Sequence, residues 1–281
     1  MALERLRRVL DEWRDDVTYR LRYVRQTVDP MRQGDHRLKI VCLDVNHGDA
    51  TLIVLPSGRV MLVDSAKEAW ARRRVIPFLD NHNIGEITYY VTTHYHEDHV
   101  GQRERILKDY LVKHAWDYRT FETGQVLEDF EGTRLTVLNS HADAEDENDR
   151  SLSFRLELDG FVYTHGADLY ADGQRRVLAR FPELVRTHVY RANHHMHGSV
   201  SGDYLVQADP VVVVISAQEA VYERIAYTRD FCAAARQMRA GRLRDVCLTL
   251  ERGNVVIFAN GEDDWGWASY RPEIVLSGLY P

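Results

Sequence analysis

The sequence predicts an α/β fold in which two strand-rich halves form a sandwich of β-sheets with helices on its outer faces. Short apolar runs of strand length, separated by turn residues, far outnumber helical patterns in the middle of the chain. Helical patterns separate the two strand-rich halves, which favours a sandwich over a single parallel sheet. No repeat, low-complexity tract or domain break interrupts the 281 residues, a length that suffices for a large core.

Residues 1–30 predict one amphipathic helix that precedes the main domain, which is expected over 38–281. Apolar residues recur at steps of three and four with charged residues between them, and the pattern ends at Asp29-Pro30. The apolar positions are Leu3, Leu6, Leu10, Trp13, Val17, Leu21, Val24 and Val28. Such a helix either packs on its own domain or pairs with another chain, so a homodimer or another protein partner remains an open alternative.

The elements of the main domain follow from alternation and turn signals. In the first half we expect strands over 38–45, 50–56 and 59–65, a helix over 69–84, a strand over 87–94, and further elements around 114–121 and 133–140. In the second half we expect a hairpin over 151–168 turning at Asp159-Gly160, helices over 173–185 and 227–241, strands over 187–195 and 210–216, and a closing hairpin over 245–260. Ser57-Gly58 is expected to join the second and third strands in a turn.

The composition excludes several classes of protein. The formal net charge of −7 argues against unspecific coating of nucleic acid, which needs many uncompensated Lys and Arg residues. The three cysteines (Cys42, Cys232 and Cys247) form no C-x-x-C pair, which indicates a reducing compartment. The charged N-terminus has no apolar signal-peptide core, and no apolar run is long enough to cross a membrane. These features predict a cytoplasmic protein with no membrane association.

The run "THYHEDHVGQ" (93–102) concentrates metal-ligand side chains. His94 and His96 are two residues apart, so their imidazoles point the same way at the end of an extended strand. Asp98 and His99 lie beyond them, where the chain is expected to turn. Two directions from one short run suit two metal ions held close together, and imidazole and carboxylate are ordinary ligands of zinc and similar ions.

This run resembles the H-x-H-x-D-H signature of metallo-β-lactamase-fold hydrolases, which are αββα sandwiches. Residues 43–66, "LDVNHGDATLIVLPSGRVMLVDSA", resemble the opening of the ComEC-type branch, the hydrolase domain of competence DNA-uptake channels and its stand-alone relatives. Later motifs of that branch follow in order as "NDRSL" (148–152), "GAD" (166–168) and "HHMHGS" (194–199). The resemblance covers roughly residues 38–218 and implies an αββα sandwich, with the N-terminal helix as an addition.

The resemblance also implies a role for each matching residue. His94 and His96 would bind the first ion, and Asp98 and His99 the second. Asp168 would bridge both ions, and His194 would complete the second, so Asp98, Asp168 and His194 are the expected catalytic residues. Asp64 would be the carboxylate that orients a ligand from behind. Taken alone, Asp168 is more simply a turn residue after a hairpin.

Three departures from the family pattern bear on the site. Asn148 stands where many members supply a third histidine to the first ion, and it could ligate weakly, hold a water or contact substrate, with His141 or Glu147 as substitutes. Because "HHMHGS" is longer than H-H-G-S, His194, His195 and His197 compete for one or two places. Strand phase favours His194 as the ligand. "VNHGD" replaces the usual glycine-glutamine, so His47 either reaches the site or is a solvated turn residue.

Two metal ions bridged by an aspartate and a water imply hydrolysis by a metal-bridging hydroxide. No serine or cysteine nucleophile motif and no glycine-rich phosphate loop competes with this interpretation. The oxygen character of the first ion's ligands allows manganese or iron beside zinc.

The leading hypothesis is a phosphodiesterase or nuclease acting on nucleic acid or nucleotides. Phosphate contacts could come from Arg103, Arg105, Arg175 and Arg176, which could equally be solvated helix residues. The alternatives are a hydrolase of lactone, amide or peptide bonds, and a non-catalytic binding or assembly module of a larger complex.

Overall fold

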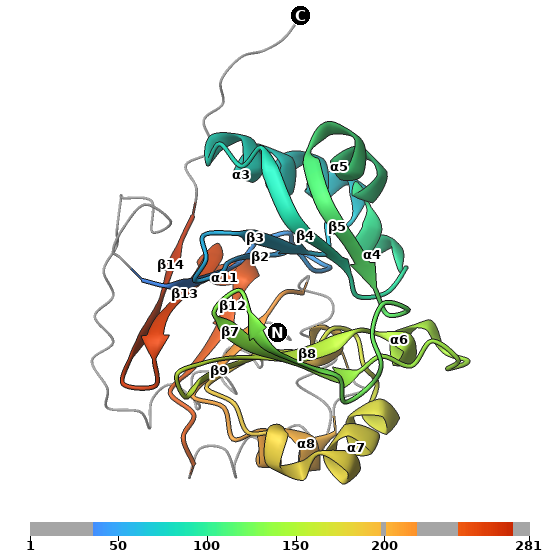
Figure 1. The fold of residues 1–281 in the computed structure, drawn as a ribbon, viewed down its shortest axis with the longest axis vertical. Helices are drawn as coiled ribbons and strands as arrows, with labels where there is room; N and C mark the ends of the chain where they lie inside the picture. The colour runs from blue at the N-terminus through green and yellow to red at the C-terminus, as the bar shows by residue number, and fades with distance from the viewer. Residues whose placement is uncertain (1–35, 198–200, 218–240, 272–281) are drawn as a thin grey trace, which may run out of the picture.

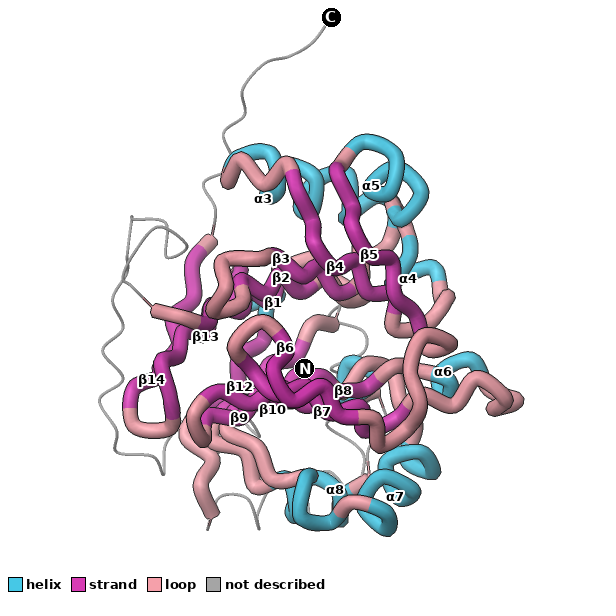
Figure 2. The backbone as a smooth tube through the Cα atoms, viewed as in Figure 1, coloured by secondary structure: helices cyan, strands magenta, loops and turns pink. Residues whose placement is uncertain are grey.

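The computed structural model describes residues 36–197, 201–217 and 241–271. Within these ranges, two seven-stranded sheets lie face to face, with helices on the outer face of each sheet (Figures 1 and 2). The predicted αββα sandwich is therefore confirmed. The helix predicted over 1–30 and, apart from Gly241, the helix predicted over 227–241 lie outside the described residues.

The first sheet is antiparallel on one side and parallel on the other. Its strand order is β14-β13-β1-β2-β3-β4-β5, and the pairs β3–β4 and β4–β5 are parallel. Its strands are β1 (Leu38–Cys42), β2 (Thr51–Val54), β3 (Val60–Val63), β4 (Glu86–Thr92), β5 (Leu111–Asp117), β13 (Asn254–Gly261) and β14 (Asp264–Tyr270).

The second sheet has a similar division, with the order β12-β11-β10-β9-β8-β7-β6. The strands from β9 to β12 are parallel, and those from β6 to β9 are antiparallel. Its strands are β6 (Val126–Phe130), β7 (Thr133–Asn139), β8 (Ser153–Leu158), β9 (Phe161–His165), β10 (Val189–Arg191), β11 (Val212–Ile215) and β12 (Asp245–Leu248).

The helices form two outer layers and two short turns at the edge between the sheets. In Figure 1, α3 and α5 cover the first sheet, α7 and α8 cover the second, and α4 and α6 lie at the right-hand edge. The helices are α2 (Glu68–Trp70), a π-helical turn (Ala71–Val75), α3 (Ile76–Asn81), α4 (Glu97–Val100), α5 (Arg103–Asp109), α6 (Glu147–Arg150), α7 (Ala171–Arg180), α8 (Gly202–Ala208) and α11 (Thr249–Arg252). Short 3-10 turns span Pro182–Leu184 and Asn193–Met196.

Strand β1 shows why its sequence is continuously apolar. Leu38, Ile40 and Cys42 pack in the core between the sheets, whereas Val41 packs in the core beneath α3 and α5. Because successive side chains of a strand point to opposite faces, both faces of β1 are buried. A third apolar cluster joins the second sheet to α7 and α8.

Local turn chemistry predicted two connections correctly. The β8–β9 hairpin turns at Asp159 and Gly160, whose φ values of 44° and 85° are those that a tight hairpin requires. The β2–β3 turn contains Gly58 at φ 83°, and its N–H donates to the carbonyl of Leu55 at 2.8 Å.

The closing hairpin predicted over 245–260 is wrong. β12 pairs with β11 in the second sheet, whereas β13 pairs with β1 and β14 in the first. The short helix α11 carries the chain from one sheet to the other. Each strand finds a partner distant in sequence, which local alternation does not reveal. Among the described residues, no helix is long and apolar enough to cross a membrane.

A buried ion pair links the two sheets. Arg191 of β10 and Asp49, in the β1–β2 loop, are exposed by only 1% and 2%, and Arg191 Nη2 lies 2.9 Å from Asp49 Oδ1. Arg191 Nη1 also donates to the carbonyl of Val214 at 3.4 Å. Removing one partner of such a pair leaves the other charge uncompensated in the interior.

We therefore expect Arg191→Met to lower the free energy of unfolding by about 3–5 kcal/mol, because Asp49 would remain buried without its partner. Arg186→Met is the control, since the side chain of Arg186, which pairs with Asp209, is 62% exposed. The control should change stability by less than about 1 kcal/mol. Urea unfolding followed by circular dichroism measures both, and equal effects would contradict the structural role of the buried pair.

Candidate metal centre

The residues predicted as metal ligands meet at the edge of the sandwich that carries α4 and α6 (Figure 1). The run His94–His99 follows β4 and enters α4, and Asn148 belongs to α6. Asp168 follows β9, and His195 follows its neighbour β10. Because the ends of β9 and β10 lie side by side, residues far apart in sequence approach one another there.

The first group of side chains contains His94, His96, Asn148 and Asp168. His94 Nε2 lies 3.1 Å from His96 Nδ1, and His96 Nδ1 lies 3.0 Å from Asn148 Oδ1. Asp168 Oδ2 is 3.7 Å from His94 Nε2. Asn148 therefore lies where the first ion could use an amide oxygen.

The two residues considered as substitutes for Asn148 have other surroundings. Glu147 Oε1 accepts a hydrogen bond from the backbone N–H of Tyr95 at 2.9 Å, and Arg150 donates to its other oxygen. Glu147 thus stabilises the run His94–His99, which we call the ligand loop, through the backbone of Tyr95. His141 is exposed.

The second group contains Asp98, His99, Asp168 and His195, which can each offer one ligand atom within 4.8 Å of the others. Asp168 Oδ2 lies 3.2 Å from His99 Nε2 and 3.4 Å from His195 Nε2. Asp98 Oδ2 lies 3.4 Å from His195 Nε2. Asp168 Oδ2 therefore approaches imidazole nitrogens of both groups, as a bridging carboxylate would.

The donor set fits divalent metal ions. His99 Nε2 and His195 Nε2 are buried and make no hydrogen bond with the described residues. Buried polar atoms normally form a hydrogen bond, so two imidazole nitrogens that lie 3.2 and 3.4 Å from Asp168 Oδ2 without one indicate ligand atoms of a cation. A third imidazole, His94, is fully buried.

The charges of the second group stabilise one another. Burial alone would raise the pKa of Asp168, but His195 and His99 hold it well below its ordinary value. Burial alone would lower the pKa of His99, but Asp168 and Asp64 raise it well above its ordinary value. Burial likewise opposes protonation of His195, yet its carboxylate neighbours raise the pKa to about 9. Binding of cations here would therefore release protons.

Asp64 lies directly behind His99. Its Oδ2 is 2.7 Å from His99 Nδ1, and the N–H and hydroxyl of Thr93 donate to its two oxygens at 2.8 and 2.6 Å. The contact fixes the ring of His99 with Nε2 toward Asp168. This is the geometry of a carboxylate that orients a metal-ligating histidine.

That His194 completes the second group stays a prediction, and the structure brings the neighbouring His195 within ligand distance of Asp98, His99 and Asp168. β10 ends at Arg191, and His194, His195 and Met196 follow with φ values of 44°, 51° and 59°. These left-handed residues end the strand alternation on which the choice of His194 depended. His194 instead packs its ring 4.7 Å from Tyr170 and 5.3 Å from His197.

Two further side chains lie at the site, of which the sequence named the first as an open alternative and missed the second. His47, which the sequence left either at the site or solvated in a turn, lies beside the second group, with Nε2 3.4 Å from Asp98 Oδ2. Thr93 hydrogen-bonds Asp64 and lies 3.1 Å from His94 Nδ1. The available sequence signal for Thr93 was its position as a polar residue immediately before the run His94–His99.

The arginines considered for phosphate contacts have partners within the protein. Arg103 Nε donates to Thr92 and its guanidinium lies 5.7 Å from the ring of Tyr95. The other three are paired with acidic side chains, in the pairs Arg105–Asp109, Arg175–Asp172 and Arg176–Asp149.

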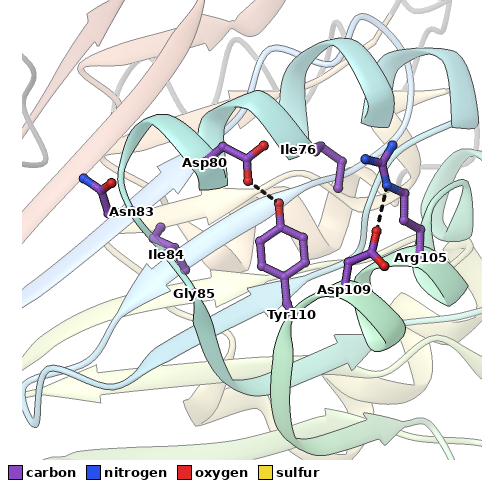
Figure 3. Close-up of a pocket in the computed structure, with 8 residues that line it drawn as sticks. All are labelled: Ile76, Asp80, Asn83, Ile84, Gly85, Arg105, Asp109 and Tyr110. Atoms are coloured by element: carbon purple, nitrogen blue, oxygen red, sulfur yellow. Dashed lines mark hydrogen bonds and ion pairs between the residues drawn. The ribbon is translucent and has the colours of Figure 1, made fainter.

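A hollow of about 510 Å³ lies between α3 and α5, away from the ligand groups (Figure 3). Four of its polar side chains form two hydrogen-bonded pairs. Tyr110 donates to Asp80 at 2.7 Å, and Arg105 donates to Asp109 at 3.2 Å. None of its lining residues belongs to either ligand group.

The geometry predicts that replacing His195 lowers metal binding, whereas replacing its neighbour His194 does not. His195→Gln should weaken binding of one of about two ions by more than roughly tenfold, because it removes a ligand nitrogen, whereas His194→Gln should retain the wild-type metal content. Metal analysis after gel filtration measures both. Loss of metal from the His194 variant alone would contradict the assignment.

No family model matches the chain. Among curated proteins, it is 25% identical over 215 residues to ComE operon protein 3 of Bacillus subtilis (strain 168), a match that covers 62% of this chain and 28% of that protein. The chain thus spans less than a third of the length of that relative.

Similar solved structures include the metallo-β-lactamase fold protein YhfI from Bacillus subtilis, with 11% identity, a TM-score of 0.45, and coverage of 75% of this chain and 96% of YhfI. Another is Igni18, a metallo hydrolase from Ignicoccus hospitalis KIN4/I, with 14% identity, a TM-score of 0.44, and coverage of 83% and 100%. The chain's two facing sheets, outer helices and H-x-H-x-D-H loop at the shared edge give it the metallo-β-lactamase fold, and its sequence similarity to ComE operon protein 3 supports the ComEC-type resemblance.

Proposed function

We propose that the chain is a metal-dependent hydrolase that cleaves phosphodiester bonds, with zinc or manganese as its two ions. The observation that carries this proposal is the position of Asp168. Its Oδ2 lies within 3.7 Å of His94, 3.2 Å of His99 and 3.4 Å of His195. One buried carboxylate shared between two ligand groups is the arrangement of a two-ion site.

The ions, when bound, would supply a water of lowered pKa and positive charge to stabilise the attacked phosphoryl group. The chain's own residues would hold the ions. His94, His96 and Asn148 would bind one ion, and Asp98, His99 and His195 would bind the other. Asp64 and Thr93 keep the ligand loop in a single orientation. No step in this assignment requires a protein nucleophile.

The choice of phosphodiesters over other bonds has two supports. The ComEC-type resemblance implies nuclease or phosphodiesterase work, and two ions spaced across a shared carboxylate suit the two oxygens of a phosphoryl centre. The amide oxygen of Asn148 gives the first group more oxygen character, which favours manganese or iron beside zinc.

We expect Asp168→Asn to reduce phosphodiesterase activity by more than about 100-fold, since it weakens a ligand of both ions and even residues behind the ligands typically cost 10–100-fold. Asp172→Asn, a carboxylate on the exposed start of α7, is the matched control and should retain activity. Hydrolysis of bis-p-nitrophenyl phosphate in Mn²⁺ or Zn²⁺ measures both variants. Equal activity of the two would remove Asp168 from the mechanism.

The substrate class is tested with metal-loaded wild-type protein. Single-stranded DNA, double-stranded DNA, RNA and bis-p-nitrophenyl phosphate are incubated with Mn²⁺ or Zn²⁺, and we expect at least one to be cleaved and cleavage to stop when EDTA is added. Absence of all cleavage in protein that retains two ions would favour hydrolysis of a lactone, amide or peptide bond. Absence of retained metal would favour a non-catalytic module.

A further inference from the structure

The turn between β1 and β2 places one more imidazole against the second ligand group. His47 Nε2 lies 3.4 Å from Asp98 Oδ2, and the ring of His47 lies 4.6 Å from the ring of His195. The His47 side chain is 26% exposed, so it contacts the ligands on one side and faces solvent on another. Both of its neighbours are members of the second group.

The backbone around His47 is fixed to the ligand loop. Gly48 has φ +106°, and a Cβ there would lie 2.2 Å from the carbonyl oxygen of Asp98. Only glycine allows this close approach of two backbones. The N–H of Asp49 then donates to the same carbonyl oxygen at 3.1 Å.

Asp49 extends this attachment into the interior. Its carbonyl accepts from the N–H of Ala66 at 2.7 Å, and its carboxylate pairs with Arg191 at 2.9 Å. The turn that carries His47 is therefore anchored to the first sheet, the second sheet and the ligand loop.

The position of its side chain allows His47 to hold the carboxylate of Asp98. His47 Nε2 lies 3.4 Å from Asp98 Oδ2, the same oxygen that lies 3.4 Å from His195 Nε2. Because a carboxylate oxygen has two lone pairs, an Oδ2 that ligates an ion can also accept a hydrogen bond from His47. His47 Nδ1 is buried and makes no hydrogen bond with the described residues. Among the described residues, the ring of His47 thus makes its polar contact through Nε2, with Asp98.

From this geometry we infer that His47 is a positioning residue of the second ligand group, which holds Asp98 through Nε2 and supports the ring of His195 through packing. The inference rests on the proposed metal centre, but not on the nature of the substrate. It assigns to the β1–β2 turn a function in metal affinity, with Gly48 and Asp49 as its support. Donors behind ligating carboxylates keep those ligands in the geometry that the ion requires.

The test compares His47→Ala and His47→Gln with wild type in the full chain after chelation and dialysis. His114→Ala, a change at an exposed histidine of β5, is the control. Calorimetric titration with Mn²⁺ gives the number and affinity of ions. Visible absorption of the Co²⁺-substituted protein reports the geometry around them, and thermal unfolding of the metal-free variants reports stability.

We expect His47→Ala to weaken one of two ions by about 10–100-fold, to leave the other unchanged, and to alter the Co²⁺ spectrum. His47→Gln should recover part of this affinity, since its amide N–H can reach Asp98. The metal-free variants and the His114 control should unfold as wild type does.

Two results would overturn the inference. One is wild-type affinity for both ions in His47→Ala with an unchanged spectrum. The other is an equal loss at both sites accompanied by a lower unfolding temperature, which would show a general structural role. Failure to cleave any phosphodiester, with the selective affinity loss intact, would overturn the proposed function alone. A wild-type chain that binds no ion would overturn both.

Discussion

The ion pair between Asp49 and Arg191 is the interaction on which the rest of the structure depends. It connects the second sheet to the β1–β2 loop of the first, and both partners are buried. The backbone of Asp49 also binds Ala66 and the carbonyl of Asp98. The contact that joins the sheets is thereby the contact that locates the ligand loop, so the packing of the sandwich and the geometry of the centre are set together.

The candidate centre concentrates charge that the fold must stabilise without solvent. Asp64, Asp98 and Asp168 face imidazoles that carry raised or lowered pKa values according to their neighbours. Carboxylates that would be costly alone become tolerable beside protonated histidines. Divalent ions can take over this role, because they supply more positive charge in less space. The same side chains therefore serve stability when ions are absent and chemistry when they are bound.

Prediction from the sequence succeeded where the determining interactions are local. His94, His96, Asp98 and His99 lie in one run, and the turn at Asp159-Gly160 is encoded by its own two residues. It did not single out His195 among the neighbouring histidines, because strand periodicity does not apply to the left-handed residues His194, His195 and Met196 that follow β10. It failed for β12 and β13, whose partners are chosen by tertiary packing. Arg191 gave a weak signal as a lone charge within an apolar strand, but its partner lies 142 positions earlier, at Asp49.

The two-faced strands restrict where the chain can accept additional residues. In β1, one residue added after Leu38 would exchange the side chains that face the other sheet with those that face the helices. The Ser57-Gly58 turn is different, since the space around Gly58 is open, and the φ of +83° requires only that Gly58 itself be kept. A fluorescent label or a short peptide tag introduced at that turn would therefore leave both apolar layers in register and would lie on a loop that contributes nothing to the ligand groups.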